Sequence, residues 1–363
     1  MVNNLNIIIC GGGTGGHLIP AFAIADAFLS NNSNVEIRFI GSEKGIESHL
    51  YKKRKEKSYL LKSVGLDRSL TLKGFFHNTI TFPLNFLSSM FKTFKIFNEF
   101  KVDIVIGTGG YSSAIPLFVA YIKGIKFFIQ EQNSIPGLVN RIFLKSAKKV
   151  FFGVEPDECK SNNYLVIGNP TKLINNDRKK EVKVDSRKFT IFIIGGSQGS
   201  VPINSHFVEN YTKYLDLYPN IHIIWQCGEK NLVSIREQVQ SESIELHGFI
   251  NNIENFYLKS NLIISRSGAL TLSEISNFKK ASILIPFPFA ANDHQMSNAR
   301  FFQKHGASII VKQEHLKTGL LEKEVNLLIK EKKQLKKMEK NASLISKPNA
   351  AQNIVKEILK YVR

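Results

Sequence analysis

Residues 5–20, LNIIICGGGTGGHLIP, decide the fold of this chain, because residues 189–200, FTIFIIGGSQGS, repeat the same pattern. In each stretch an apolar run, interrupted in the first only by Asn6, ends in closely spaced glycines and leads into a segment with helical spacing. Such a run is typical of a parallel strand buried on both faces, and glycines permit the tight turn into a crossover helix. The chain is therefore predicted to hold two similar α/β halves, each opening with a strand, a glycine-rich turn and a helix.

Further short apolar runs extend both series and alternate with helical segments such as residues 20–29. The predicted strands of the first half are 5–10, 35–40, 102–106, 126–129, 149–152 and 165–167, and those of the second half are 189–194, 221–226, 244–246, 262–265, 282–285 and 307–311. We place the domain boundary after residue 167, which gives domains 1–167 and 168–348. An amphipathic helix is predicted over residues 349–363, with Asn349 as its N-cap.

The composition limits the classes of protein that fit. A length of 363 residues suits two domains, and 43% hydrophobic with 22% charged residues indicates a folded chain. Lys and Arg outnumber Asp and Glu by 49 to 30, and the net charge of +19 favours an anionic partner: nucleic acid, a phosphorylated metabolite or a membrane. A compositional bias toward Lys, Asn and Ile is the alternative explanation. Three scattered cysteines without a CxxC pair argue against zinc and for a reducing cytosol, and neither a signal peptide nor a transmembrane run is expected.

Three glycine-rich turns follow predicted strands, at residues 11–17 (GGGTGGH), 107–111 (GTGGY) and 195–200 (GGSQGS). The helix after such a turn presents free N–H groups and a partial positive charge, which suit a phosphate. The turns therefore predict a ligand cleft at the carboxyl ends of the strands, with ligand-free tight turns as the alternative. The first turn has the dinucleotide-binding spacing, but the second strand ends in Gly41-Ser42 without an acidic residue, and no P-loop lysine follows. A nicotinamide-dependent enzyme is therefore disfavoured.

Seven motifs together resemble one family. They are 11–20 (GGGTGGHLIP), 107–116 (GTGGYSSAIP), 131–140 (EQNSIPGLVN), 168–170 (GNP), 195–200 (GGSQGS), 265–274 (SRSGALTLSE) and 286–299 (PFPFAANDHQMSNA). In this order, over nearly the whole chain, they closely resemble the MurG family of peptidoglycan UDP-N-acetylglucosamine transferases. The resemblance implies a GT-B fold, with two Rossmann-like doubly wound parallel-sheet domains facing across a cleft and the C-terminal helix returning to the first. It also implies an inverting hexosyltransferase that moves N-acetylglucosamine from UDP-GlcNAc to the C4 hydroxyl of the muramic sugar of lipid I, giving lipid II.

The resemblance also implies which residues contact the substrates. Two places after the Asn-Pro pair the family usually has arginine, whereas this chain has Lys172, which keeps the charge but loses the two-pronged donor. With Lys172 as the candidate for a diphosphate contact, the residues that the resemblance implies as contacts to the donor UDP-GlcNAc are Thr14, Gly15, Gly16, Asn133, Ser197, Ile250, Ala269, Leu270, Thr271, Leu272, Ser273, Glu274 and Gln295.

The chemistry of these residues suits a nucleotide sugar. Glu274, early in a predicted helix, would accept hydrogen bonds from both ribose hydroxyls, although a carboxylate near a helix N-terminus is also favourable by itself. Ser197 would cradle the diphosphate, cap the following helix, or do both. Ile250 would offer main-chain groups to uracil or pack in the core. The amides of Gln295 and Asn133 would bind sugar hydroxyls, those at C3 and C4 of GlcNAc in the case of Gln295.

His17 and Glu131 are the candidates for the general base that an inverting displacement needs. An unperturbed histidine pKa of about 6.5 suits proton transfer near neutrality. His17 otherwise orients the loop or binds the donor, and Glu131 is then the base. The chain has no Asp-x-Asp pair. We therefore expect no metal and no cofactor, with helix N-termini and cationic side chains stabilising the departing UDP.

Residues 74–97 combine many aromatic and aliphatic side chains with lysines, and the basic stretch KKRK lies upstream at 52–55. This pattern suits a membrane interface, and a core helix with solvated lysines is the alternative. With a lipid-linked acceptor, it predicts peripheral binding to the anionic cytoplasmic face of the inner membrane, with cell-wall synthesis or division proteins as further partners.

Two other function classes stay open from the sequence. One is another GT-B nucleotide-sugar enzyme, such as a UDP-GlcNAc 2-epimerase or a glycolipid synthase. The other is a non-catalytic nucleotide-sugar-binding module. A nucleic-acid binder would explain the positive charge, but the chain has no RNP, helix-turn-helix or zinc-finger pattern, so we expect no nucleic acid as partner.

Overall fold

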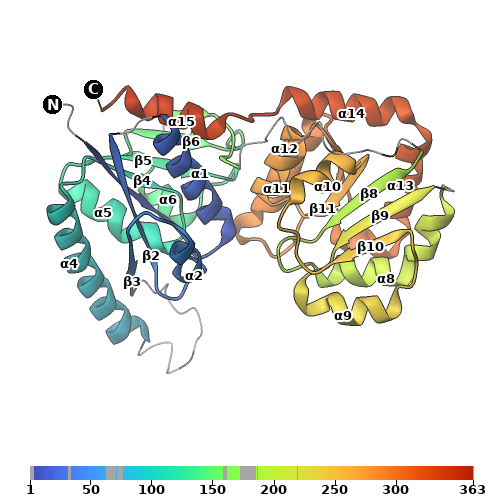
Figure 1. The fold of residues 1–363 in the computed structure, drawn as a ribbon, viewed down its shortest axis with the longest axis horizontal. Helices are drawn as coiled ribbons and strands as arrows, with labels where there is room; N and C mark the ends of the chain where they lie inside the picture. The colour runs from blue at the N-terminus through green and yellow to red at the C-terminus, as the bar shows by residue number, and fades with distance from the viewer. Residues whose placement is uncertain are drawn as a thin grey trace. The chain divides into compact units, whose positions relative to one another are not determined.

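The computed structural model describes residues 4–31, 34–62, 71, 77–157, 162–171, 185, 187–218 and 220–362. The chain divides into two compact units (Figure 1). Unit 1 consists of Met1–Lys172 together with Asn349–Arg363, and unit 2 consists of Leu173–Pro348. The C-terminal segment thus belongs to the N-terminal unit.

Unit 1 is built on a seven-stranded sheet in which all neighbouring strands pair in parallel. Its strand order is β3-β2-β1-β4-β5-β6-β7. Strand β3 was not predicted, because its apolar run is only three residues long and stands between charged segments. The strands are β1 (Leu5–Cys10), β2 (Val35–Ser42), β3 (Ser58–Leu61), β4 (Ile104–Gly107), β5 (Lys126–Glu131), β6 (Lys149–Phe152) and β7 (Tyr164–Val166).

Unit 2 repeats this design with a six-stranded parallel sheet in the order β10-β9-β8-β11-β12-β13. Its strands are β8 (Phe189–Ile194), β9 (Ile221–Gln226), β10 (Ile244–His247), β11 (Leu262–Ser265), β12 (Ala281–Leu284) and β13 (Ser308–Ile310). Counted within each unit, both sheets contain the order 3-2-1-4-5-6 of the Rossmann fold. The predicted class of two doubly wound parallel-sheet domains is confirmed. The order reverses beside β1 in unit 1 and beside β8 in unit 2, and the glycine-rich turns follow these strands.

Helices cover both faces of the unit 1 sheet. On one face α1 and α15 pack through a core that includes Ile24 and Ile354. On the other face α4, α5 and α6 pack through Phe97, Leu117 and Phe143 (Figure 1). Helix α15 realises the predicted C-terminal helix, but Asn349 makes no side-chain cap hydrogen bond. The helices are α1 (Gly15–Asn31), α2 (Glu47–Leu50), α4 (Phe82–Phe100), α5 (Ala114–Ile122), α6 (Leu138–Phe143) and α15 (Ala350–Leu359).

Unit 2 is covered in the same way. Helices α8, α9 and α13 pack on one face, α10, α11 and α12 pack on the other, and α14 contributes to both cores. The helices are α8 (Val201–Asp216), α9 (Glu229–Gln238), α10 (Ile253–Lys259), α11 (Ala269–Asn277), α12 (His294–Lys304), α13 (Leu320–Lys330) and α14 (Lys332–Leu344). Among the described residues, none of the helices has both the length and the apolar content that a membrane crossing requires.

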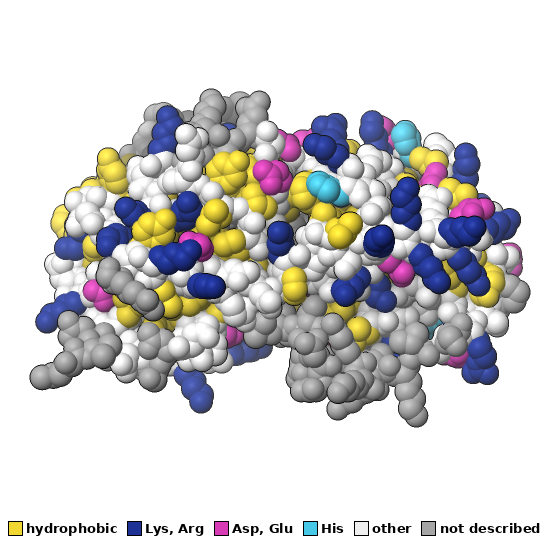
Figure 2. All heavy atoms as spheres, turned by 90° about the horizontal axis from the view of Figure 1, so that it is seen from above, with side chains coloured by type: hydrophobic (Ala, Val, Ile, Leu, Met, Phe, Trp, Pro, Cys, Tyr) yellow, Lys and Arg dark blue, Asp and Glu magenta, His cyan; other side chains and the backbone are white. Residues whose placement is uncertain are grey.

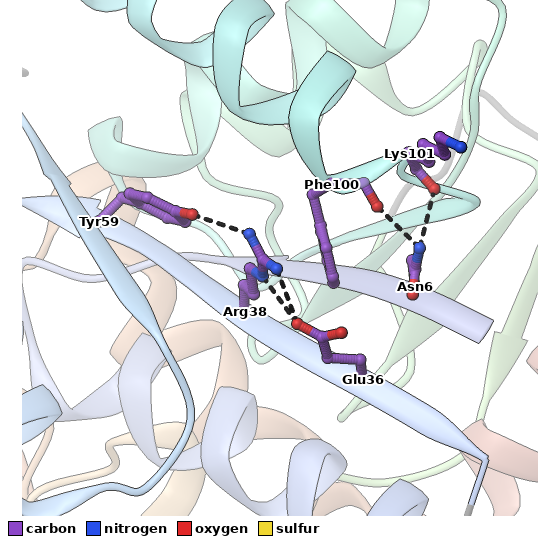
Figure 3. Close-up of polar contacts among 6 residues, drawn as sticks. All are labelled: Asn6, Glu36, Arg38, Tyr59, Phe100 and Lys101. Atoms are coloured by element: carbon purple, nitrogen blue, oxygen red, sulfur yellow. Dashed lines mark hydrogen bonds and ion pairs between the residues drawn. The ribbon is translucent and has the colours of Figure 1, made fainter. Parts of the chain in front are cut away.

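The polar Asn6 inside β1 has a structural explanation (Figure 3). Its Nδ2 donates to the carbonyl of Phe100, at the end of α4, over 2.7 Å. The guanidinium of Arg38 lies 3.9 Å from the centre of the Phe100 ring and donates to Glu36 and to the Tyr59 hydroxyl. These contacts attach the end of α4 to the sheet near the amino-terminal ends of β1 and β2, whereas the glycine-rich turns follow the carboxyl ends of the strands.

Candidate active site

The two glycine-rich turns of unit 1 pack against each other beside the point where the strand order reverses. The turn after β1 and the turn after β4 are joined by a hydrogen bond from the Gly12 N–H to the Gly109 carbonyl. A Cβ on Gly110 would lie 2.3 Å from the carbonyl oxygen of Gly12, so no larger residue fits this approach. Gly13 has a φ of 83° and no atom within 4 Å of its Cβ position. Because α1 begins at Gly15, its first amides border this open turn and suit an anion.

A buried carboxylate that the sequence analysis missed holds the first turn in place. Glu47 is fully buried, and its Oε1 accepts the N–H of Ser42 over 2.8 Å. Its Oε2 accepts the N–H of Gly13 over 2.9 Å. The hydroxyl of Tyr51 also donates to the Gly11 carbonyl. Glu47 stands in a polar stretch, GSEKGIES, where nothing in the sequence distinguishes a buried acid from an exposed one.

His17 lies in the first turn of α1 and faces the second glycine turn. Its Nδ1 is 3.0 Å from the Thr108 carbonyl and 2.9 Å from Oε1 of Gln132. A Cβ on Gly109 would lie 2.8 Å from the same nitrogen, so glycine is needed there. A neutral ring that donates from Nδ1 carries its lone pair on Nε2. The ring is therefore arranged to accept a proton at Nε2.

Glu131 at the end of β5 is almost fully buried and accepts hydrogen bonds at both carboxylate oxygens. Its Oε1 accepts from the N–H and the Nδ2 of Asn133, at 3.0 and 3.2 Å. Its Oε2 accepts from the N–H of Gly137 at 3.0 Å and from Nδ2 of Asn140 at 2.8 Å. These four bonds hold the loop from 131 to 140 in one conformation, so the contacts of Glu131 favour a structural role in that loop.

In unit 2 the turn after β8 places Ser197 on the surface. Gly196 and Gly199 have φ values of 97° and 75°, and a Cβ on Gly199 would overlap the Cys227 carbonyl. The N-cap position of α8 belongs to Ser200, so the predicted alternative that Ser197 caps this helix is wrong. Its exposure on the turn stays compatible with a diphosphate contact.

Arg266, directly after β11, is a buried cation that the sequence analysis did not single out. Only 8% of the residue is exposed. It donates to the carbonyls of Ile285 and Pro286 and to side-chain oxygens of Ser200 and Gln313, over 2.6–3.1 Å. Burial lowers the pKa of Arg266 to about 10, so the guanidinium stays charged at neutral pH. It joins the turn after β8 to the end of β12 and adds positive charge beneath that turn.

The segment from 269 to 274 begins α11, as predicted, with Gly268 at the N-cap position. The side chains of Ala269 and Leu272 are buried in the core, so these residues can offer a ligand only their main chain. Glu274 is half-buried, and its Oε2 accepts the hydroxyl hydrogen of Tyr257 over 3.0 Å. Tyr257 is fully buried, and burial together with the Glu274 carboxylate raises the pKa of its phenol. The tyrosine therefore stays neutral and fixes one oxygen of Glu274.

Ile250 differs from the expectation in one respect. Its N–H already donates to Oε1 of Gln226 over 3.0 Å, and Nε2 of Gln226 donates to the Gly196 carbonyl over 2.9 Å. The side chain of Ile250 packs in the core, which confirms the alternative prediction for this residue. A main-chain contact from Ile250 to uracil would therefore use its carbonyl and not its N–H.

Gln295, in the first turn of α12, is held from both sides. Its Oε1 accepts the N–H of Phe287 over 3.0 Å, and its carbonyl accepts the hydroxyl of Ser267 over 2.8 Å. Asn292 and Asp293, just before α12, have φ values of 53° and 54°. Left-handed conformations at residues other than glycine cost energy and gather at functional sites. The loop before Gln295 is therefore held in a strained conformation.

The predicted residues thus form one cluster in each unit. Thr14, Gly15, Gly16 and His17 lie with Glu131 and Asn133 at the carboxyl ends of β1 and β5, whereas Ser197, Ile250, the residues 269–274 and Gln295 follow β8, β10, β11 and β12. Lys172 lies outside the described residues. In the described part of the chain, no three or more His, Cys, Asp and Glu side chains are grouped as a metal site would require.

Comparisons with known proteins agree with this geometry. The family model for the glycosyltransferase family 28 N-terminal domain matches residues 7–152, and the model for the C-terminal domain of that family matches residues 190–358. A protein of Flavobacterium psychrophilum named UDP-N-acetylglucosamine–N-acetylmuramyl-(pentapeptide) pyrophosphoryl-undecaprenol N-acetylglucosamine transferase is 36% identical, covering 98% of this chain and 97% of that protein.

Two solved structures share the fold. The crystal structure of Acinetobacter baumannii MurG superposes with a TM-score of 0.78 at 26% identity, covering 98% of this chain and 99% of that one. A UDP-GlcNAc 2-epimerase from Neisseria meningitidis, bound to UDP-GlcNAc, gives a TM-score of 0.65 at 15% identity, covering 98% of this chain and 100% of that one. The second likeness is one of fold alone.

Proposed function

We propose a function from one premise: the chain belongs to the MurG family, within glycosyltransferase family 28. It transfers N-acetylglucosamine from UDP-GlcNAc to the C4 hydroxyl of the muramic sugar in undecaprenyl-pyrophosphoryl-MurNAc-pentapeptide, lipid I, and yields lipid II for peptidoglycan. The epimerase alternative has only a shared fold in its favour, because the similar epimerase structure is 15% identical.

Unit 2 binds the donor. Glu274, with one oxygen held by Tyr257, accepts a ribose hydroxyl, and the carbonyl of Ile250 is available to uracil. The turn at 195–200 and the first amides of α8 and α11 take the diphosphate, with the Arg266 charge beneath them. The Nε2 of Gln295 binds hydroxyls of the GlcNAc ring. Positive groups fixed in advance stabilise the charge that develops on departing UDP, so the chemistry needs no metal.

Unit 1 binds the acceptor and supplies the base. The N–H groups at the start of α1, in the turn braced by Glu47, suit a phosphate. In place of the donor contact that the resemblance implies for Thr14, Gly15 and Gly16, we assign these groups to the pyrophosphate of lipid I. His17 Nε2 takes the proton of the C4 hydroxyl while its oxygen bonds to donor C1. The bond from C1 to the β-phosphate oxygen breaks, its electron pair leaves with UDP, and the configuration at C1 inverts.

The observation that carries this proposal is the pair of acceptors on Nδ1 of His17, which leaves Nε2 as the basic nitrogen. The test incubates the protein with UDP-GlcNAc and a soluble lipid I analogue and measures UDP and disaccharide product. General-base catalysis contributes about 10²- to 10⁴-fold, so His17→Ala should lose about that factor in kcat and the acidic limb of its pH profile, with donor affinity nearly unchanged. No turnover by the wild type would refute the function. A folded His17→Ala that keeps most of its kcat would refute only the base and redirect the search to Glu131.

The chain also acts at a membrane surface, as a peripheral protein on the cytoplasmic face. Helix α4 buries Ile96, Phe97 and Phe100 in the core, as the core-helix alternative predicted, but it exposes a second apolar stripe. Leu84 and Phe91 in this stripe are 63% and 69% exposed. Residues 74–76 of the predicted membrane segment lie outside the described residues. The side chain of Lys95 on the same helix is 77% exposed, and Figure 2 shows more Lys and Arg side chains than acidic ones, in keeping with the net charge of +19. Apolar side chains beside basic ones suit an anionic bilayer surface.

A further inference from the structure

A chain of three buried side-chain amides leads away from His17 into unit 1. Gln132, Gln130 and Asn169 are each at most 2% exposed. Oε1 of Gln132 lies 2.9 Å from His17 Nδ1, and its Nε2 donates both to the Thr108 carbonyl and to Oε1 of Gln130. Nε2 of Gln130 donates to Oδ1 of Asn169 over 3.0 Å, and Nδ2 of Asn169 donates to the main-chain carbonyl of Gln132 over 3.0 Å. We call these three residues the amide chain.

The amide chain can hold only one orientation. A side-chain amide can exchange its oxygen and nitrogen by rotation, but a main-chain carbonyl only accepts. Such carbonyls stand at both ends of the chain, that of Thr108 at Gln132 and that of Gln132 at Asn169. Turning the three amides over would place oxygen against oxygen at both ends, in a buried site where unpaired polar groups are costly. Gln132 must therefore present its oxygen to His17.

The chain is built by strand geometry and by one close approach. Gln130 and Gln132 are two residues apart at the end of β5, so their side chains leave the strand on the same side. Asn169 follows β7, the outermost strand on that side of the sheet. A Cβ on Gly153 would lie inside the Asn169 carboxamide, so this position needs glycine for the amide to reach Gln130.

We propose that Gln132, Gln130 and Asn169 are positioning residues that fix the Nδ1–H tautomer of His17. Neutral histidine in water prefers the proton on Nε2, which would leave no lone pair for the acceptor hydroxyl. Two oxygens at Nδ1 reverse this preference, and the amide chain fixes which end of Gln132 is one of them. The role in turnover rests on the proposed function, in which Nε2 of His17 is the base, whereas the tautomer itself can be measured without it.

The first test reads the tautomer in the full-length protein labelled with ¹⁵N-histidine. Long-range ¹H–¹⁵N correlation separates a protonated from an unprotonated ring nitrogen, and the signal missing from His17→Ala assigns His17. We expect a protonated Nδ1 and an unprotonated Nε2 in the wild type above the pKa of the ring. Gln132→Met, which keeps the length but removes the acceptor, and Asn169→Ala, which frees Gln130 to rotate, should both raise the Nε2–H population.

The second test measures turnover and its pH profile. Loss of the proper tautomer costs about 10⁴-fold in a serine protease. Because the Thr108 carbonyl remains as an acceptor, Gln132→Met should lose less, about 10- to 100-fold in kcat, with the KM for UDP-GlcNAc unchanged. Removing an acceptor from Nδ1 destabilises the imidazolium, so the acidic limb should also move to lower pH. Asn6→Ala is the matched control, because it removes a side-chain amide near the amino-terminal end of β1, at the opposite end of the strands from His17. This variant should change neither the tautomer of His17 nor the pH profile.

The outcomes separate the two proposals. An Nε2–H ring in the wild type, or unchanged ring signals in both Gln132→Met and Asn169→Ala, overturns the amide chain as the source of the tautomer. A response to Gln132→Met without one to Asn169→Ala overturns the extension beyond Gln132. If the tautomer responds as expected while kcat does not, the role in turnover is overturned, and with it the assignment of His17 as the base.

Discussion

Replacing Tyr257 with phenylalanine tests how the donor site is assembled, because it removes one hydroxyl and leaves Glu274 in place. That hydroxyl donates to Oε2 of Glu274 over 3.0 Å from a fully buried side chain. If Glu274 binds the ribose, Glu274→Ala loses hydrogen bonds to a charged acceptor worth about 1.5–3 kcal/mol, and the KM for UDP-GlcNAc should rise roughly 10- to 100-fold. Tyr257→Phe keeps the carboxylate but loses its orientation, so we expect a loss of about 1 kcal/mol, or roughly fivefold in KM.

The assay is the initial rate of UDP release, with UDP-GlcNAc varied at a saturating concentration of the lipid I analogue. Binding of UDP by calorimetry distinguishes a change of affinity from a change of KM alone. Tyr214→Phe is the matched control. Tyr214 is also fully buried in unit 2, but its hydroxyl lies 2.7 Å from His206, away from the candidate site. Tyr214→Phe also removes one buried hydroxyl, but it should leave the KM for UDP-GlcNAc unchanged.

Two results would refute the reasoning. A folded Glu274→Ala with an unchanged KM removes Glu274 from the donor site. An equal rise of KM in Tyr257→Phe and Tyr214→Phe means that the effect comes from weakened packing of unit 2. A rise confined to Tyr257→Phe and Glu274→Ala supports the ribose contact.

Three further predictions follow from single features. Phe91→Asp should reduce the fraction of protein that sediments with anionic vesicles, whereas Val233→Asp, at an equally exposed apolar residue of unit 2, should not. Equal binding by both variants would refute the proposal that α4 contacts the membrane. Burial lowers the pKa of His206 below its usual 6.5, so the unfolded chain binds more protons and the free energy of unfolding should fall as pH drops below about 6.5. Urea titrations at several pH values should give a flatter dependence for His206→Asn, and an equally steep one would exclude His206 as the cause. Gly124 has a φ of 66° and open space around its Cβ position, so Gly124→Ala should lower the free energy of unfolding by about 1 kcal/mol. Gly199→Ala should lower it more and weaken UDP binding, because a Cβ on Gly199 overlaps the Cys227 carbonyl. Equal losses of stability in the two variants would refute this close approach.

The sequence predicted the parts of the fold that local pattern controls. Strands β1, β8 and β11 begin and end at the predicted residues, because apolar runs between polar turns mark doubly buried strands clearly. Strand β3 was missed because only its last residue is fully buried. The N-cap of α8 is Ser200 and not Ser197, because the turn continues through Gly199. The polarity pattern of the sequence does not reveal the positive φ of that glycine.

The polar groups of the site were harder to predict, because their partners are distant in sequence. Glu47 and Gly13 are separated by 34 residues, and Gln130 and Asn169 by 39. In the sequence these residues resemble ordinary loop side chains. Their burial follows from which strands lie side by side, and the strand order becomes visible only once the sheet has formed.

The choice between His17 and Glu131 illustrates how geometry adds to residue type. As residue types, both suit a general base, and both follow strands at the same edge of the sheet. Each carboxylate oxygen of Glu131 accepts two hydrogen bonds, so using it as a base would compete with the four contacts that hold its loop. His17 instead has its two contacts on Nδ1, at 3.0 and 2.9 Å, and a ring that donates from Nδ1 carries its lone pair on Nε2. In the proposed reaction, the buried carboxylate of Glu131 therefore holds the loop next to Gln132 in place, and His17 is the group that would accept the proton.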